Sequence, residues 1–383
     1  MRARAAARLR CRHGIHRSNK APPDDPRVHR RAAARWHRRP LAAGGQPGAV
    51  GRFQPGLLIP RAGGRGTVRA AVEDPLRRRG FRGRHRGCRS GPGDGAIGTA
   101  EALVAEQFPA WAKLPIRAVA SQGTVNALFR IGDRLAARFP LQPGDVDETL
   151  RWLKAEAEAA RELAGRTRFP TPEHVALGEP GPGYPLPWSV QTWVPGSVAT
   201  DADPGESVAF AHDLAEFIRD VRAIGTRGRT FGGSGRGGEL TSQDEWMKTC
   251  FSRSEGWLDV SRLRRMWRVL RTAPRGTDGD VMTHGDLVPG NVLVADGRLA
   301  GVIDVGGLGP ADPALGLVGA WHLLETGPRE VLREDLGCDD REWQRGRAWA
   351  FAQAMGLVWY YVTSNPTMSF IGRRTLDRLL QAG

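Results

Sequence analysis

The sequence predicts an α+β protein of two lobes that follows a long basic segment. Three observations lead to this prediction. Residues 99–194 contain several strand-length apolar runs and one charged helix, which is typical of a small antiparallel sheet. After Pro195-Gly196 the spacing of the apolar residues becomes helical. A single apolar hairpin, residues 292–303, interrupts this helical half.

The first quarter of the 383-residue chain carries its excess of positive charge. Residues 1–100 contain 24 Lys and Arg against 5 Asp and Glu, whereas residues 101–383 contain 32 against 36. The segment is rich in Arg, Gly and Pro and has no sustained period, so we expect residues 1–97 to be disordered. Our hypothesis is a mis-assigned start, and the alternative is an arm that binds nucleic acid.

Cysteine spacing and hydropathy exclude several classes of protein. The four cysteines lie far apart and form neither a disulfide framework nor a zinc-binding pattern. No apolar run approaches the roughly 18 residues of a membrane helix, and the basic N-terminus lacks the apolar core of a signal peptide. We therefore expect a cytoplasmic protein with no membrane partner.

The first lobe, residues 98–195, is predicted to be an antiparallel sheet with few helices. Thr99 is the expected N-cap of a helix that continues to Phe108. A charged helix is expected at about 146–165. The predicted strands are residues 116–119, 127–131, 135–139, 175–177 and 188–194.

The second lobe, residues 196–383, is predicted to be mainly helical. Apolar residues between Val208 and Val221 fall on one helical face, and the region from about 313 to 383 is helical and rich in Trp. The hairpin in this lobe turns at Asp296-Gly297, a pair suited to a type I′ turn.

Three polar residues lie at the two ends of this hairpin. Asp286 and Asn291 precede it in the segment HGDLVPGN (284–291), and Asp304 follows it. Phosphoryl transfer needs a carboxylate that accepts the proton of the attacking hydroxyl, and oxygen ligands that hold Mg²⁺ on the phosphates. Because a hairpin brings its ends together, Asn291 and Asp304 can share a metal ion. We predict Asp286 as the catalytic base and the other two residues as Mg²⁺ ligands.

The order H-x-D-x-x-x-x-N, hairpin, D-x-G resembles the catalytic segment of the protein-kinase fold. With HGD at 284–286 and DVGGLGPADP at 304–313, the chain is similar to the aminoglycoside-phosphotransferase family, from Thr99 to the C-terminus. The resemblance implies a two-lobed, protein-kinase-like fold that binds ATP and Mg²⁺. It also implies transfer of the γ-phosphate to a hydroxyl of a small molecule.

The resemblance also identifies candidate ATP-binding residues in the first lobe. The segment SQGTVN (121–126) corresponds to the loop over the phosphates, which makes Ser121, Gly123 and Asn126 candidates. The strand 188–194 corresponds to the hinge between the lobes. Gln191 to Trp193 are therefore expected to offer backbone contacts to the adenine ring.

Four further residues follow from the same resemblance. Arg138 stands where kinases usually have a lysine, and a guanidinium can also bind phosphate. Its expected acidic partner is Glu156, with Glu158 as the substitute. His284 is expected to organise the catalytic loop rather than to transfer protons, and Asp312 to support the metal-binding loop.

The acceptor is expected to bind among the C-terminal helices. Aminoglycosides are polycations, so a pocket for them should be rich in carboxylates. Candidate carboxylates are Asp201, Asp203, Glu325, Asp339 and Asp340. Candidate aromatic residues, which could equally belong to the core, are Trp321, Trp349, Trp359 and Tyr360.

Three functions remain open at this point. The first is phosphoryl transfer to a small molecule, for which an aminoglycoside-like antibiotic and a related sugar or metabolite are equal candidates as the acceptor. A non-catalytic kinase-like protein that only binds nucleotide is the second function, and nucleic-acid binding through the basic segment is the third.

Overall fold

The computed structural model describes residues 94–120, 125–142, 144–233, 235–276 and 279–382. The predicted disorder of residues 1–93 lies outside the described residues. The first described element is helix α2 (Asp94–Gln107), so the boundary predicted at residue 98 falls within a helix. Thr99 is not an N-cap, because its hydroxyl donates to the carbonyl oxygen of Gly95 at 3.0 Å, a bond that threonine makes inside helices.

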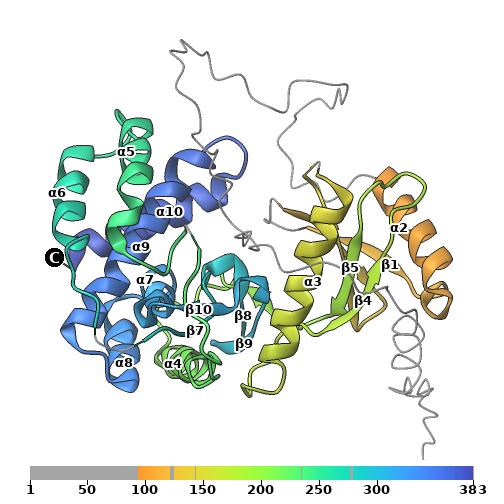
Figure 1. The fold of residues 1–383 in the computed structure, drawn as a ribbon, viewed down its shortest axis with the longest axis horizontal. Helices are drawn as coiled ribbons and strands as arrows, with labels where there is room; N and C mark the ends of the chain where they lie inside the picture. Colours follow the sequence, from red (N-terminus) through yellow and green to blue (C-terminus); the bar gives the residue numbers. More distant parts are fainter. Residues whose placement is uncertain (1–93, 121–124, 143, 234, 277–278, 383) are drawn as a thin grey trace, which may run out of the picture. The chain divides into compact units, whose positions relative to one another are not determined.

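Five strands form the predicted antiparallel sheet, in the order β1-β2-β3-β5-β4 (Figure 1). Helix α3 (Val146–Leu163) connects β3 to β4 and packs against β4 and β5. Its N-cap is Asp145, whose carboxylate accepts the N–H of Glu148 at 2.9 Å. The strands are β1 (Ile116–Val119), β2 (Asn126–Ile131), β3 (Leu135–Pro140), β4 (His174–Gly178) and β5 (Trp188–Thr192).

An aromatic cluster fills the core of this first lobe. The ring of Phe139 stacks on that of Trp188 at a centroid distance of 4.6 Å and meets Phe129 edge-on at 5.5 Å. Trp188 is fully buried, and a Cβ at Gly178 would lie within 2.0 Å of its ring. Glycine at position 178 therefore lets β4 lie directly beside the tryptophan.

Helices form most of the second lobe, as predicted. The longest, α9, packs against α10, α7, α6 and α5, and its residues from Ala348 to Val358 are almost completely buried. The helices are α4 (Val208–Arg222), α5 (Asp244–Arg253), α6 (Val260–Leu270), α7 (Val318–Leu323), α8 (Thr326–Leu336), α9 (Asp340–Tyr360) and α10 (Pro366–Gln381). Short 3₁₀ turns are η2 (Pro109–Trp111), η3 (Leu240–Gln243), η4 (Pro289–Asn291), η5 (Val305–Gly307) and η6 (Pro313–Leu317).

The predicted hairpin is formed by β8 (Val292–Ala295) and β9 (Arg298–Val302). Asp296 and Gly297 at its turn both have positive φ, at 51° and 70°, as a type I′ turn requires. Strand β6 (Ser197–Val198) pairs with β8. The sequence did not predict a second small sheet, in which β7 (Val281–Thr283) pairs with β10 (Gly309–Ala311).

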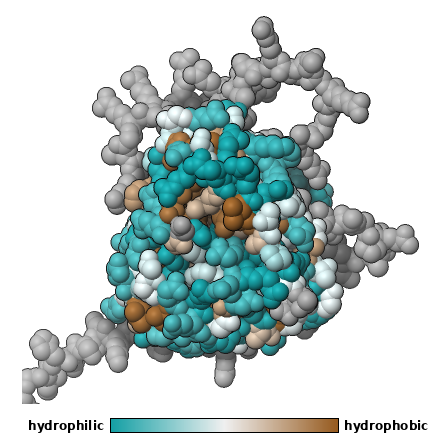
Figure 2. All heavy atoms as spheres, turned by 90° about the vertical axis from the view of Figure 1, so that its left-hand side faces the viewer, coloured by the Kyte–Doolittle hydropathy of each residue, from teal (hydrophilic) through white to brown (hydrophobic). Residues whose placement is uncertain are grey.

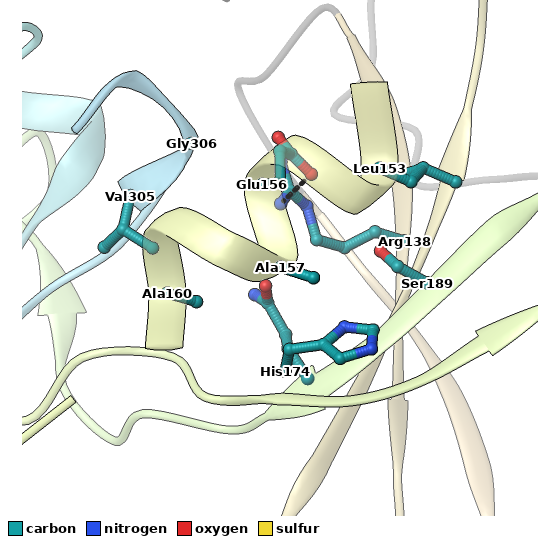
Figure 3. A pocket seen from close by; sticks show the side chains of 10 residues that line it. Arg138, Leu153, Glu156, Ala157, Ala160, His174, Ser189, Val305 and Gly306 are labelled. Atoms are coloured by element: carbon teal, nitrogen blue, oxygen red, sulfur yellow. Dashed lines mark hydrogen bonds and ion pairs between the residues drawn. The ribbon is translucent and has the colours of Figure 1, made fainter. Parts of the chain in front are cut away.

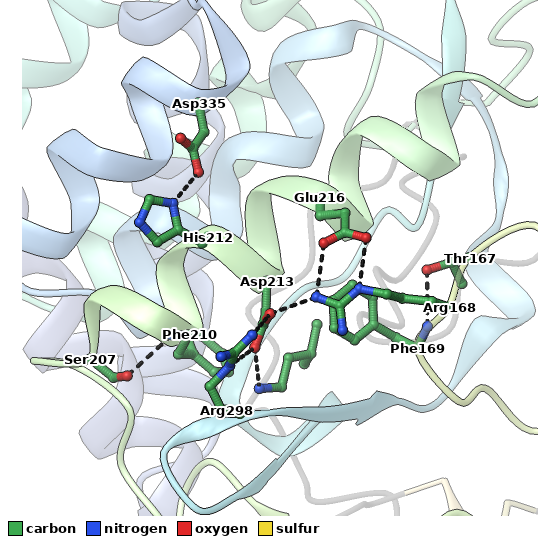
Figure 4. A network of polar contacts seen from close by, with 11 residues as sticks. Thr167, Arg168, Phe169, Ser207, Phe210, His212, Asp213, Glu216, Arg298 and Asp335 are labelled. Carbon is green, nitrogen blue, oxygen red and sulfur yellow. Dashed lines mark hydrogen bonds and ion pairs between the residues drawn. The ribbon is translucent and has the colours of Figure 1, made fainter.

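A buried carboxylate joins α4 to this hairpin (Figure 4). Asp213 accepts hydrogen bonds from Nε and Nη2 of Arg298, both at 2.6 Å, and from Arg168 Nη2 at 2.8 Å. Burial raises the pKa of Asp213, but the bonds from Arg298, the Leu299 N–H and Arg168 outweigh burial and hold the pKa below its ordinary value. This network fixes the hairpin whose two ends carry the candidate site.

The face of the molecule in Figure 2 is mainly hydrophilic, with small separate groups of hydrophobic side chains. The large hydrophobic side chains that are most exposed, Val269 and Phe370, lie on different helices. Within the described part of the chain, no helix is long and apolar enough to cross a membrane.

Candidate active site

The carboxylate of Asp286 lies on the turn between β7 and η4. Gly285 begins this turn with a φ of 81°, a backbone conformation that residues with a side chain rarely adopt. The amide Nδ2 of Asn291 donates to the Asp286 backbone oxygen at 3.0 Å and to its Oδ2 at 3.1 Å. The five-residue spacing thus brings the two side chains together on one short loop.

His284 lies beneath this loop and is almost completely buried. Its Nε2 is 3.1 Å from the Ile303 carbonyl oxygen, and its Nδ1 is 3.4 Å from the Asp286 backbone nitrogen. Burial lowers the pKa of His284, and a neutral ring with the proton on Nε2 satisfies both contacts. In this arrangement the imidazole links the loop of Asp286 to the end of β9.

The hairpin brings Asn291 and Asp304 to the same end of the lobe. The Ile303 N–H donates to the Asn291 carbonyl oxygen at 2.9 Å, and Asp304 follows in a left-handed conformation with φ 60°. Both bonds of the Asn291 side chain use Nδ2, which leaves its Oδ1 outside these contacts. Amide and carboxylate oxygens suit Mg²⁺, so the residues present fit this ion.

Binding of Mg²⁺ here would need phosphate oxygens of a nucleotide in addition to Asn291 and Asp304. In the part of the chain that the structure describes, no group of three His, Cys, Asp or Glu side chains could hold a metal alone. Mg²⁺ usually binds through one or two carboxylates together with substrate phosphates, so the small protein ligand set is compatible with a nucleotide-bound ion.

Arg138 on β3 bridges two carboxylates from different parts of the chain. Its Nη1 donates to Glu156 Oε2 on α3, and its Nη2 donates to Asp304 Oδ1, both at 3.1 Å. Burial raises the pKa of Glu156 to about 7, although Arg138 acts in the opposite direction. The three side chains bring the strand, the helix and the loop of Asp304 to one point, and they place Glu156 rather than Glu158 beside the arginine.

A pocket lies beside this contact (Figure 3). Arg138 and Glu156 point toward each other across it, and His174, Ser189 and Gly306 lie around them. A Cβ at Gly306 would lie 2.7 Å from Cγ of Glu156. Only glycine at this position lets the loop after Asp304 approach α3 so closely.

Of the other candidate ATP-binding residues, the structure describes some and not others. Ser121 and Gly123 lie outside the described residues. Asn126 is the first residue of β2, and its side-chain oxygen is buried without a partner among the described residues. Gln191 lies in β5, between β3 and β4.

The backbone contacts expected from Gln191 to Trp193 stay a prediction, but two N–H groups of this segment are already bonded. Its N–H already donates to the Arg134 carbonyl oxygen at 2.7 Å, and the N–H of Thr192 donates to Glu173 at 2.9 Å. These two donors are used within the sheet and are not free for an adenine ring in this arrangement. The sequence pattern identified the strand but could not show which of its amides the neighbouring strands use.

Asp312 is buried at the centre of another network. Its Oδ2 accepts from Arg345 Nη2 at 2.5 Å and from Trp349 Nε1 at 3.0 Å, while its Oδ1 accepts the N–H of Ala314 at 3.0 Å. Asp312 and Arg345 are each only 2% exposed. The carboxylate therefore fixes the start of η6 to α9, close in sequence to the loop of Asp304.

The sequence analysis missed two residues that contact Asp286. Arg236 Nη2 lies 3.1 Å from Asp286 Oδ1, and Gln353 Nε2 donates to the same oxygen at 2.5 Å. Arg236 is flanked by glycines in the segment 235–238, and this composition was its only signal in the sequence. Gln353 is the one amide side chain on an otherwise apolar stretch of α9, from Ala348 to Val358.

The candidate acceptor residues separate into paired charges and core aromatics. Trp321 and Trp349 are almost fully buried, as the core interpretation predicted, whereas Tyr360 is 42% exposed. Four of the five carboxylates contact arginines. These contacts are Asp203–Arg374, Glu325–Arg374, Glu325–Arg378, Asp339–Arg341 and Asp340–Arg333.

Comparisons with known proteins identify the family of the chain. A family model described as "Phosphotransferase enzyme family" (APH) matches residues 116–349, more than half of the chain. Aminoglycoside 3′-phosphotransferase from Escherichia coli is 29% identical over 147 residues, which are 36% of this chain and 53% of that protein. The match thus spans about half the length of this relative.

Two solved structures share the fold. The GDP and kanamycin complex of APH(2″)-IIIa has a TM-score of 0.57 at 17% identity, covering 74% of this chain and 99% of the other. Macrolide 2′-phosphotransferase from Brachybacterium faecium has a TM-score of 0.50 at 17% identity, covering 74% and 98%. The predicted fold class and family resemblance are confirmed, and the chain belongs to the phosphotransferase enzyme family.

Proposed function

We propose that this protein is an ATP-dependent phosphotransferase that transfers the γ-phosphoryl group to a hydroxyl of a small molecule. The acceptor would be an aminoglycoside-like antibiotic or a related sugar or metabolite. The observation that carries the proposal is a set of two contacts, of Asn291 with Asp286 at 3.0 and 3.1 Å and of Arg138 with Asp304 at 3.1 Å. The hairpin links them, because the N–H of Ile303 donates to the Asn291 carbonyl oxygen at 2.9 Å. These residues come from both lobes and supply each group that phosphoryl transfer requires.

Each residue has a defined role in this proposal. Asp286 orients the acceptor hydroxyl and accepts its proton as the new oxygen–phosphorus bond forms. The bond between the γ-phosphorus and the bridging oxygen breaks, and ADP leaves. Arg138, held by Glu156, binds phosphate oxygens of the nucleotide.

Asn291 and Asp304 would hold Mg²⁺. When bound, this ion neutralises charge on the phosphates. The contact between Arg138 and Asp304 supports this assignment, because it places the phosphate-binding cation and the metal-binding carboxylate side by side. Nucleotide phosphates that enter here would meet both groups together.

The test uses the full chain with Mg-ATP and a panel of aminoglycosides, macrolides and amino-sugar metabolites. Mass spectrometry should detect one acceptor that gains the mass of a phosphoryl group. Asp286→Asn should abolish this product. The matched control is Asp296→Asn, because Asp296 lies at the exposed turn of the same hairpin and should not be needed.

Two negative results have different meanings. If the chain binds Mg-ATP but modifies no compound, the acceptor lies outside the panel. If it neither binds Mg-ATP nor forms a product, the proposal fails.

A further inference from the structure

One arginine outside the sequence motifs reaches the catalytic carboxylate. Arg236 Nη2 lies 3.1 Å from Asp286 Oδ1 and 3.3 Å from the Gly285 carbonyl oxygen. Its side chain is only 13% exposed. Its Nη1 is buried and has no hydrogen-bond partner among the residues described, so this donor is not committed to another protein group.

The backbone around Arg236 is anchored on both sides. Gly237 has a φ of 121°, and a Cβ there would lie 2.8 Å from that of Ala311. Three backbone carbonyl oxygens of this segment accept hydrogen bonds. Gln243 Nε2 donates to that of Gly235 at 3.1 Å, the Asp312 N–H to that of Gly237 at 2.8 Å, and Arg345 Nη2 to that of Gly238 at 3.4 Å. The position of the guanidinium is therefore built into the fold.

The charge of Arg236 acts within a poorly hydrated region. Gln353 contacts Asp286 from α9 and also approaches His322, whose Nε2 is 3.3 Å from the Gln353 Oε1. Burial first, and then the charge of Arg236, lower the pKa of His322 to about 3. Gln353 and His322, which link Asp286 to α10, are thus neutral and add no negative charge.

Four of the five candidate acceptor carboxylates are already paired with arginines. Glu325 accepts hydrogen bonds from Arg374 at 2.8 Å and from Arg378 at 2.7 Å, which lower its pKa to about 2 despite partial burial. Arg374 also lies 2.5 Å from Asp203. An ammonium group that bound here would have to displace an arginine from its partner.

We propose that Arg236 is a specificity-determining residue of the acceptor site. It favours acceptors that are neutral or anionic beside the reacting hydroxyl and disfavours polycationic ones. The inference rests on the proposed function, in which Asp286 marks the place of that hydroxyl. Since the acceptor must approach the carboxylate that Arg236 contacts, an ammonium group close to the hydroxyl would be repelled by the guanidinium. The unpaired Nη1 instead suits an oxygen.

Calorimetric titration of the full chain with kanamycin, a polycationic probe, tests this inference. The proteins are the wild type, Arg236→Gln and Arg236→Met, which remove the charge, and Arg236→Lys, which keeps it. Arg264→Gln is the matched control, because Arg264 on α6 pairs with Glu255 of the second lobe, which is not a candidate acceptor carboxylate. Each titration is run with and without a magnesium complex of a non-hydrolysable ATP analogue.

The two variants without the charge should bind kanamycin at least about tenfold more tightly than the wild type. Arg236→Lys and Arg264→Gln should keep the wild-type affinity. Equal affinity of the wild type and the uncharged variants overturns the inference, and so does undetectable binding by all of them. Thermal unfolding checks that each variant is folded. If Arg236→Gln is unfolded, Arg236→Met provides the same test.

Failure of the proposed function would give a different result. Wild-type protein that does not bind the magnesium–nucleotide complex contradicts the proposed phosphotransferase activity. The titrations without nucleotide still show whether the charge of Arg236 acts on a polycation.

Discussion

Acidification should destabilise this protein through His322. The imidazole is 3% exposed, and its Nδ1 lies 2.8 Å from the hydroxyl oxygen of Thr375. Its Nε2 contacts the oxygen of the Gln353 amide, whose nitrogen donates to Asp286. This orientation of the amide requires a proton on Nε2. The Thr375 hydroxyl has one proton, which either His322 Nδ1 at 2.8 Å or the Ile371 carbonyl oxygen at 2.9 Å can accept. Burial of the ring favours its neutral form, in which Nδ1 is an acceptor.

The size of the effect follows from the pKa difference between the folded and unfolded chains. Burial, and secondarily Arg236, lower the pKa of His322 from 6.5 to about 3 in the folded protein. Below pH 6.5 the unfolded chain binds a proton that the folded chain does not, so stability is complete above 6.5 and falls as the pH decreases toward 3. Each pH unit corresponds to about 1.4 kcal/mol, which predicts a loss of about 2 kcal/mol between pH 6.5 and pH 5.

Urea unfolding of the wild type and of His322→Gln at several pH values measures this contribution. Glutamine can still donate to Gln353 but cannot titrate. The free energy of unfolding of the variant, relative to that of the wild type, should therefore rise by about 2 kcal/mol between pH 6.5 and pH 5. Other titrating groups, including Glu156 with its raised pKa, are common to both proteins and cancel in this difference.

Measurements above pH 7 provide the internal control, because His322 is neutral there in both states and the two curves should run parallel. Parallel curves down to pH 5 would refute the reasoning. They would mean that the imidazole gains a proton in the folded chain as easily as in the unfolded one.

Three further predictions concern the site and its support. Asp286→Asn should lower kcat by roughly 10²- to 10⁴-fold with little change in Mg-ATP affinity. Asp304→Asn should instead weaken Mg-ATP binding by at least about tenfold. Kinetics and calorimetry on both proteins measure these effects, and the opposite assignment of the two effects would contradict the roles. Gly306→Ala should weaken Mg-ATP binding by about tenfold, because the new methyl group would displace Glu156 from Arg138, and unchanged calorimetric affinity would argue against it. Asp213→Ala should destabilise the fold by about 2 kcal/mol, because the Leu299 N–H and two arginines would lose their acceptor, and the arginines, each 53% exposed, remain solvated. A loss well below about 1 kcal/mol in urea unfolding would contradict this role.

The first lobe was predictable because its signals are local. Each of the five predicted strands corresponds to an observed one, and α3 begins at the predicted residue with an aspartate cap. The observed β5 ends at Thr192 rather than at residue 194. The predicted start of the first helix was wrong because Thr99 can satisfy its hydroxyl inside a helix as well as at its end.

Short elements and sheet contacts were less predictable. Strands β7 and β10 have three residues each, too few for an alternating pattern to be distinguished from a loop. Whether Trp193 offers its N–H to a ligand depends on Arg134, in the turn before β3, and the sequence around Trp193 does not show this contact. In contrast, the contact of Arg138 with Glu156 agrees with the expected partner, since family resemblance supplied a long-range relation that spacing alone does not give.

The surroundings of Asp286 explain why motifs identify a reaction more readily than an acceptor. Asn291 is five residues from Asp286, whereas Arg236 is 50 residues before it and Gln353 is 67 residues after it. The motif residues share one loop and can be recognised by their spacing. Arg236 and Gln353 belong to separate segments that meet Asp286 only in the folded chain. A related chain could keep HGD and DVG and still differ at these two positions. Its chemistry would then be preserved while the charge that the acceptor meets would change, so acceptor specificity should be sought in residues that contact Asp286 from outside the motif.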